Sequence, residues 1–342
     1  MTDNVFTISS GTNQYQMVLP NWETDYIQSV LAKDSVPYEH TMLQVMQKQL
    51  AVDDIVLDVG ANIGNHTLFL ANVVGCRVIA FEPNSELCQA IRRSIELGKL
   101  EDRVILHEVG VGEFSAQAHF TKPIPENLGS QSLTIDATGA STIKVISIDS
   151  LKLTDKVRAI KIDVEGMEES VLKGAAELIS RDLPYLFVEA QTETDFETLH
   201  NIVVKLGYVY WDTFNATPTH WFIHKAEISE DALIDHYFEK GRDSYKLRLA
   251  KRELQEKLDQ ANQKYRNANL QINELKAKYE AANNKYNAST AKFSETRDIL
   301  DKEIKLLKNQ LAVLEKERSN ICARPDFSVG EFDFSIQNDN QG

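Results

Sequence analysis

The chain has 342 residues, of which 42% are apolar, with 37 basic against 51 acidic side chains. It exceeds one average domain and holds enough apolar residues for a sizeable core, so we expect two units. No apolar run approaches the roughly 18 residues needed to cross a bilayer, and no signal-peptide pattern opens the chain. Cys76, Cys88 and Cys322 show neither disulfide nor zinc spacing. The sequence therefore predicts a soluble, unsecreted, cytoplasmic protein.

Charge is unevenly distributed along the chain. Residues 242–342 carry 19 Lys+Arg against 16 Asp+Glu, which leaves 18 against 35, a net charge of −17, for residues 1–241. An acidic body lacks the positive charge that binds phosphates, so a nucleic-acid partner is disfavoured. A neutral or cationic substrate suits it better.

Residues 1–53 are expected to form a hairpin and two helices that cover the site. Weak alternation predicts the hairpin within the first twenty residues. Helical spacing predicts helices at Trp22–Leu31 and Tyr38–Leu50. Tyr38 and Glu39 begin the second helix and are candidate substrate contacts, with packing and helix N-terminal charge as the alternative.

Residues 54–227 alternate short apolar runs with helical patterns, which predicts a doubly wound α/β sheet. The expected helices are Asn65–Val74, Ser85–Leu97, Glu168–Ser180 and Asp195–Leu206. The expected strands are Ile55–Val59, Arg77–Phe81, Val104–Glu108, Ala159–Val164, Tyr185–Glu189, Val209–Thr213 and His220–His224.

The last two strands are separated only by Phe214–Pro218, so they are expected to pair as an antiparallel hairpin at the sheet edge. A Rossmann-like, mostly parallel sheet of seven strands closed by such a hairpin is the plan of class I methyltransferases. Dinucleotide dehydrogenases normally stay parallel. Between the strands, alternation in Phe114–Ile148 predicts extra strands and a loop, a candidate substrate lid in which Ser130 and Ser132 are candidate contacts.

A glycine-rich turn follows the first strand of this sheet. Gly60 and Gly64 would let the backbone and the next helix N-terminus approach a ligand, while Asp58 and Asn62 supply polar atoms at the rim. The alternative is a tight strand-to-helix turn without a ligand. The spacing favours a nucleoside site, because Glu82 follows Gly64 by 18 residues.

Glu82 ends the second strand at the spacing where an acidic residue meets a ribose in dinucleotide folds. A carboxylate there would accept both ribose hydroxyls. Pro83 and Asn84 follow it, and Glu108 and Val109 end the third strand. We assign these four residues to the same cofactor site.

Carboxylates also follow the fourth strand. Asp163 and Glu165 would lie on the same side if the strand geometry continued, and either could take a hydroxyl proton. If the enzyme needs a metal, the sequence places it on Asp163, Glu165 and Glu189, although no metal is expected from the spacing alone. The alternative for Glu165 and Glu168 is stabilisation of the next helix N-terminus. His66 is another candidate for the base and for a substrate contact.

These motifs resemble the FkbM family of S-adenosylmethionine-dependent methyltransferases. The matching segments are Asp58–Gly64, Phe81–Asn84, Gly129–Ser132, Ile148–Leu151, Lys161–Gly166 with Glu168, and Val171–Gly174. The resemblance covers roughly Trp22 to Lys225, and Ser94 departs from the asparagine of many relatives. It implies S-adenosylmethionine as the cofactor and O-methylation of a sugar, glycan end or polyketide-type hydroxyl, without selecting among them.

After Gly241 no glycine or proline occurs until Pro325. Apolar residues from Leu258 onward alternate spacings of three and four, which predicts a coiled coil. One helix from about Arg242 to Ile321 would measure on the order of 120 Å. We expect residues 228–324 to be a helical linker and coiled coil, and residues 325–342 to be a flexible tail.

The sequence thus predicts a glycan or glycolipid O-methyltransferase that forms a dimer or trimer through its coiled coil. The coiled coil could act as a spacer toward a glycan-assembly protein. Two other function classes stay open: a scaffold that keeps a cofactor fold without catalysis, and an NAD-dependent enzyme. The second is weakened by the edge hairpin and by the missing third glycine of a dinucleotide fingerprint.

Overall fold

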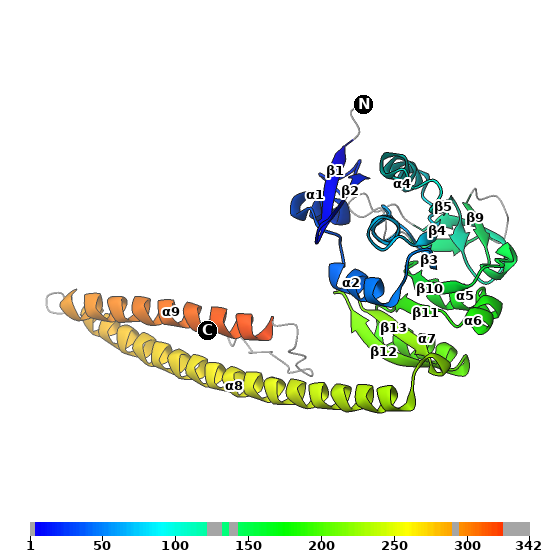
Figure 1. The fold of residues 1–342 in the computed structure, drawn as a ribbon. Helices are drawn as coiled ribbons and strands as arrows, with labels where there is room; N and C mark the ends of the chain where they lie inside the picture. The colour runs from blue at the N-terminus through cyan, green and yellow to red at the C-terminus, as the bar shows by residue number, and fades with distance from the viewer. Residues whose placement is uncertain (1–3, 122–131, 137–142, 289–293, 324–342) are drawn as a thin grey trace. The chain divides into compact units, whose positions relative to one another are not determined.

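The structure is a computed structural model that describes residues 4–121, 132–136, 143–288 and 294–323. The chain divides into two compact units, Met1–Ala232 and Leu233–Gly342. The first unit contains an open sheet with helices on both faces, and the second consists of long helices (Figure 1). None of the helices in the described ranges is long and apolar enough to span a membrane.

A seven-stranded sheet forms the centre of the first unit. Four neighbouring pairs of strands are parallel, and the last strand pairs are antiparallel. This arrangement confirms the predicted class I methyltransferase fold with its edge hairpin. In spatial order the strands are β12 (Tyr208–Phe214), β13 (Thr219–His224), β11 (Tyr185–Glu189), β10 (Val157–Ile162), β3 (Ile55–Val59), β4 (Arg77–Phe81) and β5 (Val104–His107).

The order in which the chain adds strands to the sheet reverses at β3, although β3 and β10 run parallel. The chain runs outward from β3 through β4 to β5, then returns to the other side of β3 as β10. The carboxyl ends of β3 and β10 therefore flank the switch point at which open α/β sheets bind their ligands. The predicted strand at Ala159–Val164 is two residues out of place, because β10 begins at Val157 and ends at Ile162.

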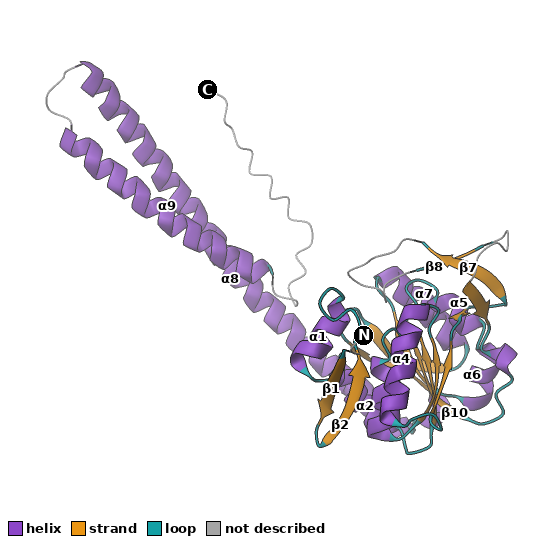
Figure 2. Ribbon diagram, turned by 90° about the horizontal axis from the view of Figure 1, so that it is seen from above, coloured by secondary structure: helices purple, strands orange, loops and turns teal. Residues whose placement is uncertain are grey.

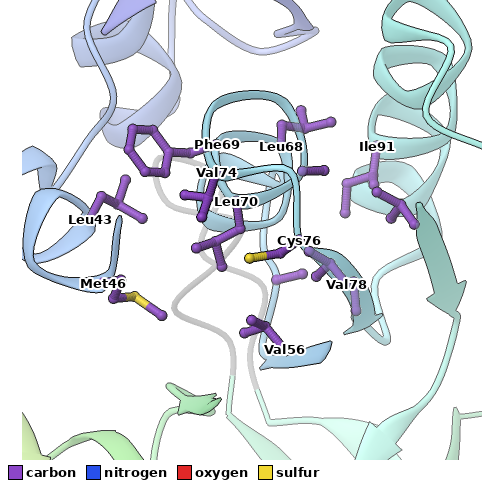
Figure 3. Packing of buried hydrophobic residues seen from close by; sticks show 14 of the residues in the cluster. Leu43, Met46, Val56, Leu68, Phe69, Leu70, Val74, Cys76, Val78 and Ile91 are labelled. Atoms are coloured by element: carbon purple, nitrogen blue, oxygen red, sulfur yellow. The ribbon is translucent and has the colours of Figure 1, made fainter. Parts of the chain in front are cut away.

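One face of the sheet packs against the N-terminal elements and the first connecting helices. Side chains alternate along β3, so Val56 joins this face while Leu57 joins the other. Figure 3 shows the inner side chains of this layer meeting around Leu70. Its elements are β1 (Val5–Ser10), β2 (Asn13–Val18), α1 (Tyr26–Asp34), α2 (His40–Gln49), α3 (Asn65–Phe69), the π-helix η1 (Leu70–Val74) and α4 (Ser85–Gly98).

The N-terminal layer differs from its prediction in the boundaries of both helices. Helix α2 begins at His40, so Tyr38 and Glu39 precede it instead of beginning it. The hairpin β1–β2 is confirmed, but the helix expected from Trp22 begins only at Tyr26. The side chain of Asp25 caps it by accepting a hydrogen bond from Gln28 N at 3.0 Å. The chain before Asp25 therefore turns instead of continuing the helix, and the helix runs on to Asp34.

The opposite face is covered by α5 (Glu168–Lys173), α6 (Ala176–Asp182) and α7 (Glu193–Lys205). The single helix expected over Glu168–Ser180 is wrong, because it breaks at Gly174. A β-carbon at Gly174 would overlap the carbonyl oxygen of Gly112, so the two backbones touch there. Asp149 then accepts hydrogen bonds from Glu177 N and Leu178 N and starts α6 separately.

A smaller sheet follows β5, as the alternation in this segment predicts. Its strands are β6 (Gly110–Val111), β7 (Ala116–Phe120), β8 (Leu133–Ile135) and β9 (Ile143–Ile146), in the order β6-β9-β7-β8. Two short 3-10 helices complete the first unit, η2 (Asp149–Leu151) and η3 (Lys225–Glu227).

The second unit is a helical hairpin. Helix α8 (Glu230–Ala288) and helix α9 (Ser294–Cys322) lie side by side in both views (Figures 1 and 2). Ile321 and Cys322 pack on Leu254 and Leu258, and the guanidinium of Arg318 lies 4.9 Å from the ring centroid of Tyr265. Residues near the end of α9 thus meet residues in the first half of α8, so the helices are antiparallel.

The single helix predicted from Arg242 to Ile321 is therefore wrong. Four members of the predicted apolar seam are buried, and one of them, Leu258, packs against Ile321 near the end of α9. The four are Leu258, Ala261, Ala268 and Ile272. A continuous heptad stripe can pack on itself once the chain turns, and a short connection costs little loop entropy. The absence of glycine and proline did not prevent the turn.

Candidate active site

A cleft opens at the carboxyl ends of β3 and β10. It has an empty volume of about 1060 Å³, counting the part that is open to solvent. The N-terminal layer, the glycine turn, the smaller sheet and the ends of β10 and β11 all contribute to its walls. This is the predicted site, at the switch point of the sheet.

The glycine turn forms the floor of this cleft. Gly60 has a φ of 81°, and a β-carbon there would overlap the carbonyl oxygen of Asp163. Asn62 also adopts a left-handed conformation, with a φ of 53°. Its Oδ1 is buried and has no hydrogen-bond partner among the described residues. The turn thus presents an unpaired acceptor at the cleft, as predicted for Asn62.

Glu82 lines the cleft beside this turn. It is 6% exposed, and its two carboxylate oxygens accept hydrogen bonds from Asn62 N and Asn84 N, each at 2.8 Å. Burial raises the pKa of Glu82 to about 7, although both amides favour the charged form. Each carboxylate oxygen keeps a further lone pair, so Glu82 can still accept two hydroxyl groups.

Asp58 does not lie at the rim, which corrects its predicted place. It is fully buried under the turn, where Oδ2 accepts a hydrogen bond from Thr67 Oγ1 at 2.6 Å. The ammonium of Lys161 lies 3.5 Å from Asp58 Oδ1 and donates to the carbonyl oxygen of Gly60 at 2.8 Å. Asp58 therefore supports the turn from below.

Lys161 also connects the turn to the acidic end of β10. It is 2% exposed, and its Nζ lies 3.4 Å from Asp163 Oδ2. Burial alone would lower its pKa, but Asp163 and Asp58 raise it above the ordinary value, so Lys161 stays charged. Sequence reasoning assigned Lys161 no role. A lysine inside an apolar strand was the available signal, because a buried ammonium needs a carboxylate partner.

Asp163, Glu165 and Glu189 meet at the acceptor side of the cleft. One carboxylate oxygen from each lies within 4.8 Å of the other two. Burial would raise the pKa of Asp163, but Lys161 and a hydrogen bond with Glu189 hold it below its usual range. Burial and the charge of Asp163 raise the pKa of Glu189 well above its usual range. Within this group, the ionised form is therefore favoured most at Asp163.

Glu165 reaches this cluster by a different path from the one predicted. The strand geometry ends at Ile162, and Glu165 lies in a turn with a left-handed φ of 53°. Gln191 Nε2 donates to its Oε2 at 2.7 Å. Glu168 closes the turn by accepting hydrogen bonds from Val164 N and Gly166 N. Glu168 therefore braces the turn that precedes α5.

Tyr38 and Glu39 lie in the cleft wall, as predicted. The side chain of Asn65 holds them over the glycine turn, because it accepts from Tyr38 N and donates to Tyr38 O, both at 2.9 Å. His66 does not line the cleft, since its Nε2 lies 3.1 Å from Glu39 Oε2 and is buried behind it. His66 is thus placed to orient Glu39.

Some of the remaining predicted residues line the cleft, and others lie outside its lining. Pro83 and Val109 line the cleft. Gly64 and Asn84 lie behind it, where Asn84 also caps α4 through its side chain. Glu108 faces away and pairs with Arg92 at 2.6 Å, which corrects its predicted cofactor contact.

The predicted polar loop of the lid is only partly described. Ser132 Oγ donates to the carbonyl oxygen of Glu165 at 2.6 Å, so it braces the turn rather than lining the main cleft. Ser130 lies outside the described residues. Sequence reasoning missed the apolar wall, although four of its members fall in segments expected to cover the site. These four are Tyr26, Ile27, Phe120 and Leu133, and the other two are Val111 and Met167.

These features suit a ligand with an apolar ring, two adjacent hydroxyls and a polar extension. The apolar wall can cover a ring, Glu82 can accept the hydroxyls, and Asn62 Oδ1 needs a donor. The residues present therefore fit S-adenosylmethionine. On the far side of the turn, the carboxylate of Asp163 can accept a proton from a second molecule.

Comparison with known proteins finds similarity to methyltransferases. Residues 58–210 match the family model described as the methyltransferase FkbM domain. A curated protein, the hexuronic acid methyltransferase AglP of Haloferax volcanii, is 29% identical over 161 residues. The match covers 46% of this chain and 64% of AglP, so the chain spans less than two thirds of that relative.

Two solved structures are also similar to this chain. The FkbM methyltransferase from Methylobacillus flagellatus KT shares 24% identity with a TM-score of 0.40, covering 59% of this chain and 48% of its own. An rRNA methylase from Streptococcus thermophilus shares 15% identity with a TM-score of 0.35, covering 54% of this chain and 92% of its own.

Proposed function

We propose, from the match of residues 58–210 to the FkbM methyltransferase domain, that the protein transfers a methyl group from S-adenosylmethionine to a sugar hydroxyl. The observation that carries the proposal is the position of Glu82 and Asp163 on opposite sides of the glycine turn, both lining one cleft. One carboxylate suits the donor and the other suits the acceptor.

The donor half of the site is assigned to the turn and the apolar wall. Glu82 would accept the ribose hydroxyls, Asn62 would accept a further donor, and Val109, Phe120 and Leu133 would enclose the adenine. Bound S-adenosylmethionine supplies an electrophilic methyl group on a sulfonium. A rigid turn matters for such a displacement, because the three reacting atoms must be collinear.

The acceptor half is assigned to the carboxylates that end β10 and β11. Asp163 would accept the hydrogen bond of the acceptor hydroxyl and take its proton as the new C–O bond forms. Lys161 keeps Asp163 ionised before the reaction, since its ammonium lies 3.4 Å from Oδ2. Glu165 is the second candidate for this proton, from its turn beside Asp163.

A sugar acceptor is favoured over other hydroxyls by the relative AglP, which is described as a hexuronic acid methyltransferase. Polyketide-type hydroxyls remain the alternative. We further propose that the helical hairpin joins the enzyme to a second copy or to a glycan-assembly protein. The mass of the full chain in solution, measured by sedimentation, tests the first of these.

The proposed activity is tested with labelled S-adenosylmethionine and a panel of glycans and their biosynthetic intermediates. Asp163→Asn should lower turnover by about 10²- to 10⁴-fold while cofactor affinity is retained. Asp155→Asn is the matched control, because Asp155 lies in an exposed ion pair with Arg77. No cofactor binding by the folded protein would refute the proposal, and binding without turnover on any acceptor would favour a scaffold.

A further inference from the structure

The acceptor side of the cleft concentrates negative charge. Asp163 ends β10, Glu165 lies in the turn after it, and Glu189 ends β11, so three separate backbone positions converge on one point. Their carboxylate oxygens lie within 4.8 Å of one another. Glu39 adds a fourth carboxylate to the same cleft wall.

Little positive charge offsets this cluster. Among the described residues that line the cleft, none is a lysine, arginine or histidine. Lys161 lies beneath the cluster and contacts Asp163, but it is shared with Asp58 and with the carbonyl oxygen of Gly60. If all three carboxylates ionise, as cation ligands do, this one shared ammonium leaves them with an excess of about two negative charges.

A second observation points to a missing ligand. Glu189 is 7% exposed, and its Oε2 is buried without a hydrogen-bond partner among the described residues. A buried carboxylate oxygen without a donor is costly, and native sites normally satisfy it. Glu189 also lines the cleft and contributes an oxygen to the converging group, so the side chain that carries the unpaired oxygen borders the same space as the other two carboxylates.

We propose that Asp163, Glu165 and Glu189 bind a divalent cation in the acceptor half of the cleft. Three carboxylates are a ligand set that hard cations prefer, and they are the only described group of acidic, histidine or cysteine side chains that converges in this way. The cation satisfies Glu189 Oε2 and offsets the excess charge.

The spacing of the oxygens indicates the class of cation. Two ligands on opposite sides of Ca²⁺ lie about 4.8 Å apart, and on opposite sides of Mg²⁺ about 4.2 Å apart. The 4.8 Å limit of the cluster is therefore comparable with the ligand separation around Ca²⁺ and somewhat wider than that around Mg²⁺. The three carboxylates leave coordination positions free on the open side of the cleft.

Those free positions determine what the cation does for the acceptor. This step rests on the proposed function, because it assumes a sugar in the cleft. Adjacent hydroxyl or carboxylate oxygens of a sugar are further hard ligands, so the cation would hold an acidic sugar that the bare carboxylates would repel. The acceptor class is then extended from neutral sugars to sugar acids.

The experiment measures cation binding directly on the full chain. Mn²⁺ titration followed by electron paramagnetic resonance, and melting curves with Mn²⁺, Ca²⁺ or Mg²⁺, are recorded after chelator treatment and dialysis. We expect one Mn²⁺ site, and at least tenfold weaker binding in Glu165→Gln and Glu189→Gln. Glu169→Gln is the matched control, because Glu169 forms only a surface ion pair with Lys173.

The melting curves keep the test valid if a variant folds poorly. Saturating cation should raise the melting temperature of the wild type and of Glu169→Gln, and should leave that of folded Glu189→Gln unchanged. Absence of binding at millimolar cation, or binding that both cluster variants leave unaltered, overturns the proposal. A selective preference for amino-sugar acceptors without cation binding would also overturn the proposal. It would indicate that the three carboxylates bind the ammonium group of the acceptor.

Turnover separates this proposal from the proposed function. Cation binding without methyl transfer to any sugar would support the proposed metal site and refute the proposed sugar methyltransferase activity. Full methyl transfer by chelator-treated protein that binds no cation would support the methyltransferase activity and refute the metal site. With both correct, chelation should lower turnover on sugar acids by at least tenfold, and Mn²⁺, Ca²⁺ or Mg²⁺ should restore it.

Discussion

At the scale of single residues, burial destabilises the ionised carboxylate of Glu82 by more than its contacts within the protein stabilise it. Two backbone amides hold its carboxylate, yet burial raises its pKa to about 7. A group whose pKa is raised in the folded state stabilises the fold less as pH rises from its unfolded value toward that pKa. Such a cost is typical of a residue that is kept for a ligand.

Glu82→Gln should therefore separate binding from stability. Cofactor affinity should fall by about 10- to 100-fold, because two charge-assisted hydrogen bonds are lost or weakened. The free energy of unfolding should change by less than about 1 kcal/mol, since losing one backbone hydrogen bond is offset by removing a buried charge. Calorimetry with S-adenosylhomocysteine and denaturant melts measure both, with Glu96→Gln on the exposed side of α4 as the control.

The same residue predicts a pH dependence of cofactor binding. Only the ionised carboxylate accepts both hydroxyls, so affinity should rise as pH increases through about 7. Between pH 6 and 8 the dissociation constant should fall by about tenfold, and Glu82→Gln should abolish this change. An equally steep profile in the variant would assign the titration to another group.

At the scale of elements, the break between α5 and α6 positions the turn that carries Glu165. Gly174 lets the backbone touch Gly112, which fixes α5 against the smaller sheet. Ser170 Oγ accepts from Glu113 N at 2.9 Å across the same contact. The element boundary is thus set by a contact distant in sequence, which explains why helical spacing alone predicted one helix.

Gly174→Ala should destabilise the first unit by about 1–3 kcal/mol, because the added methyl group has no space against a backbone carbonyl. Gly241→Ala is the contrasting substitution. Nothing lies within 4 Å of a β-carbon there, and the residue is inside α8. That change should stabilise its helix by about 1 kcal/mol. Urea melts of both variants measure the two signs, and equal effects would contradict the argument.

At the scale of the whole molecule, the chain joins a methyltransferase domain to a helical hairpin held by its own seam. Leu258→Asp should open the hairpin, since Leu258 is 2% exposed and would carry a charge into the contact with Ile321. Hydrogen exchange should become faster along α8 and α9 and stay unchanged in the central sheet. Leu247→Asp, at a position 52% exposed, should change neither.

Local patterns were sufficient for the central sheet. The bounds of β3, β4 and β11 agree with their predictions, because a buried parallel strand is a short apolar run that the sequence displays directly. The glycine turn and Glu82 were equally visible, since their spacing belongs to one βαβ unit. The apolar residues of the cleft wall, such as Ile27 and Met167, were not visible, because they come from distant segments.

Sequence by itself determined the strands along the chain, the edge hairpin, and the glycine turn with Glu82, all of which depend on residues near one another in the chain. Only the tertiary structure decided that Asp58 is buried on Lys161, that Gln191 holds Glu165, and that α9 packs back on α8. Each depends on a partner far along the chain, and no local periodicity records which partner is near.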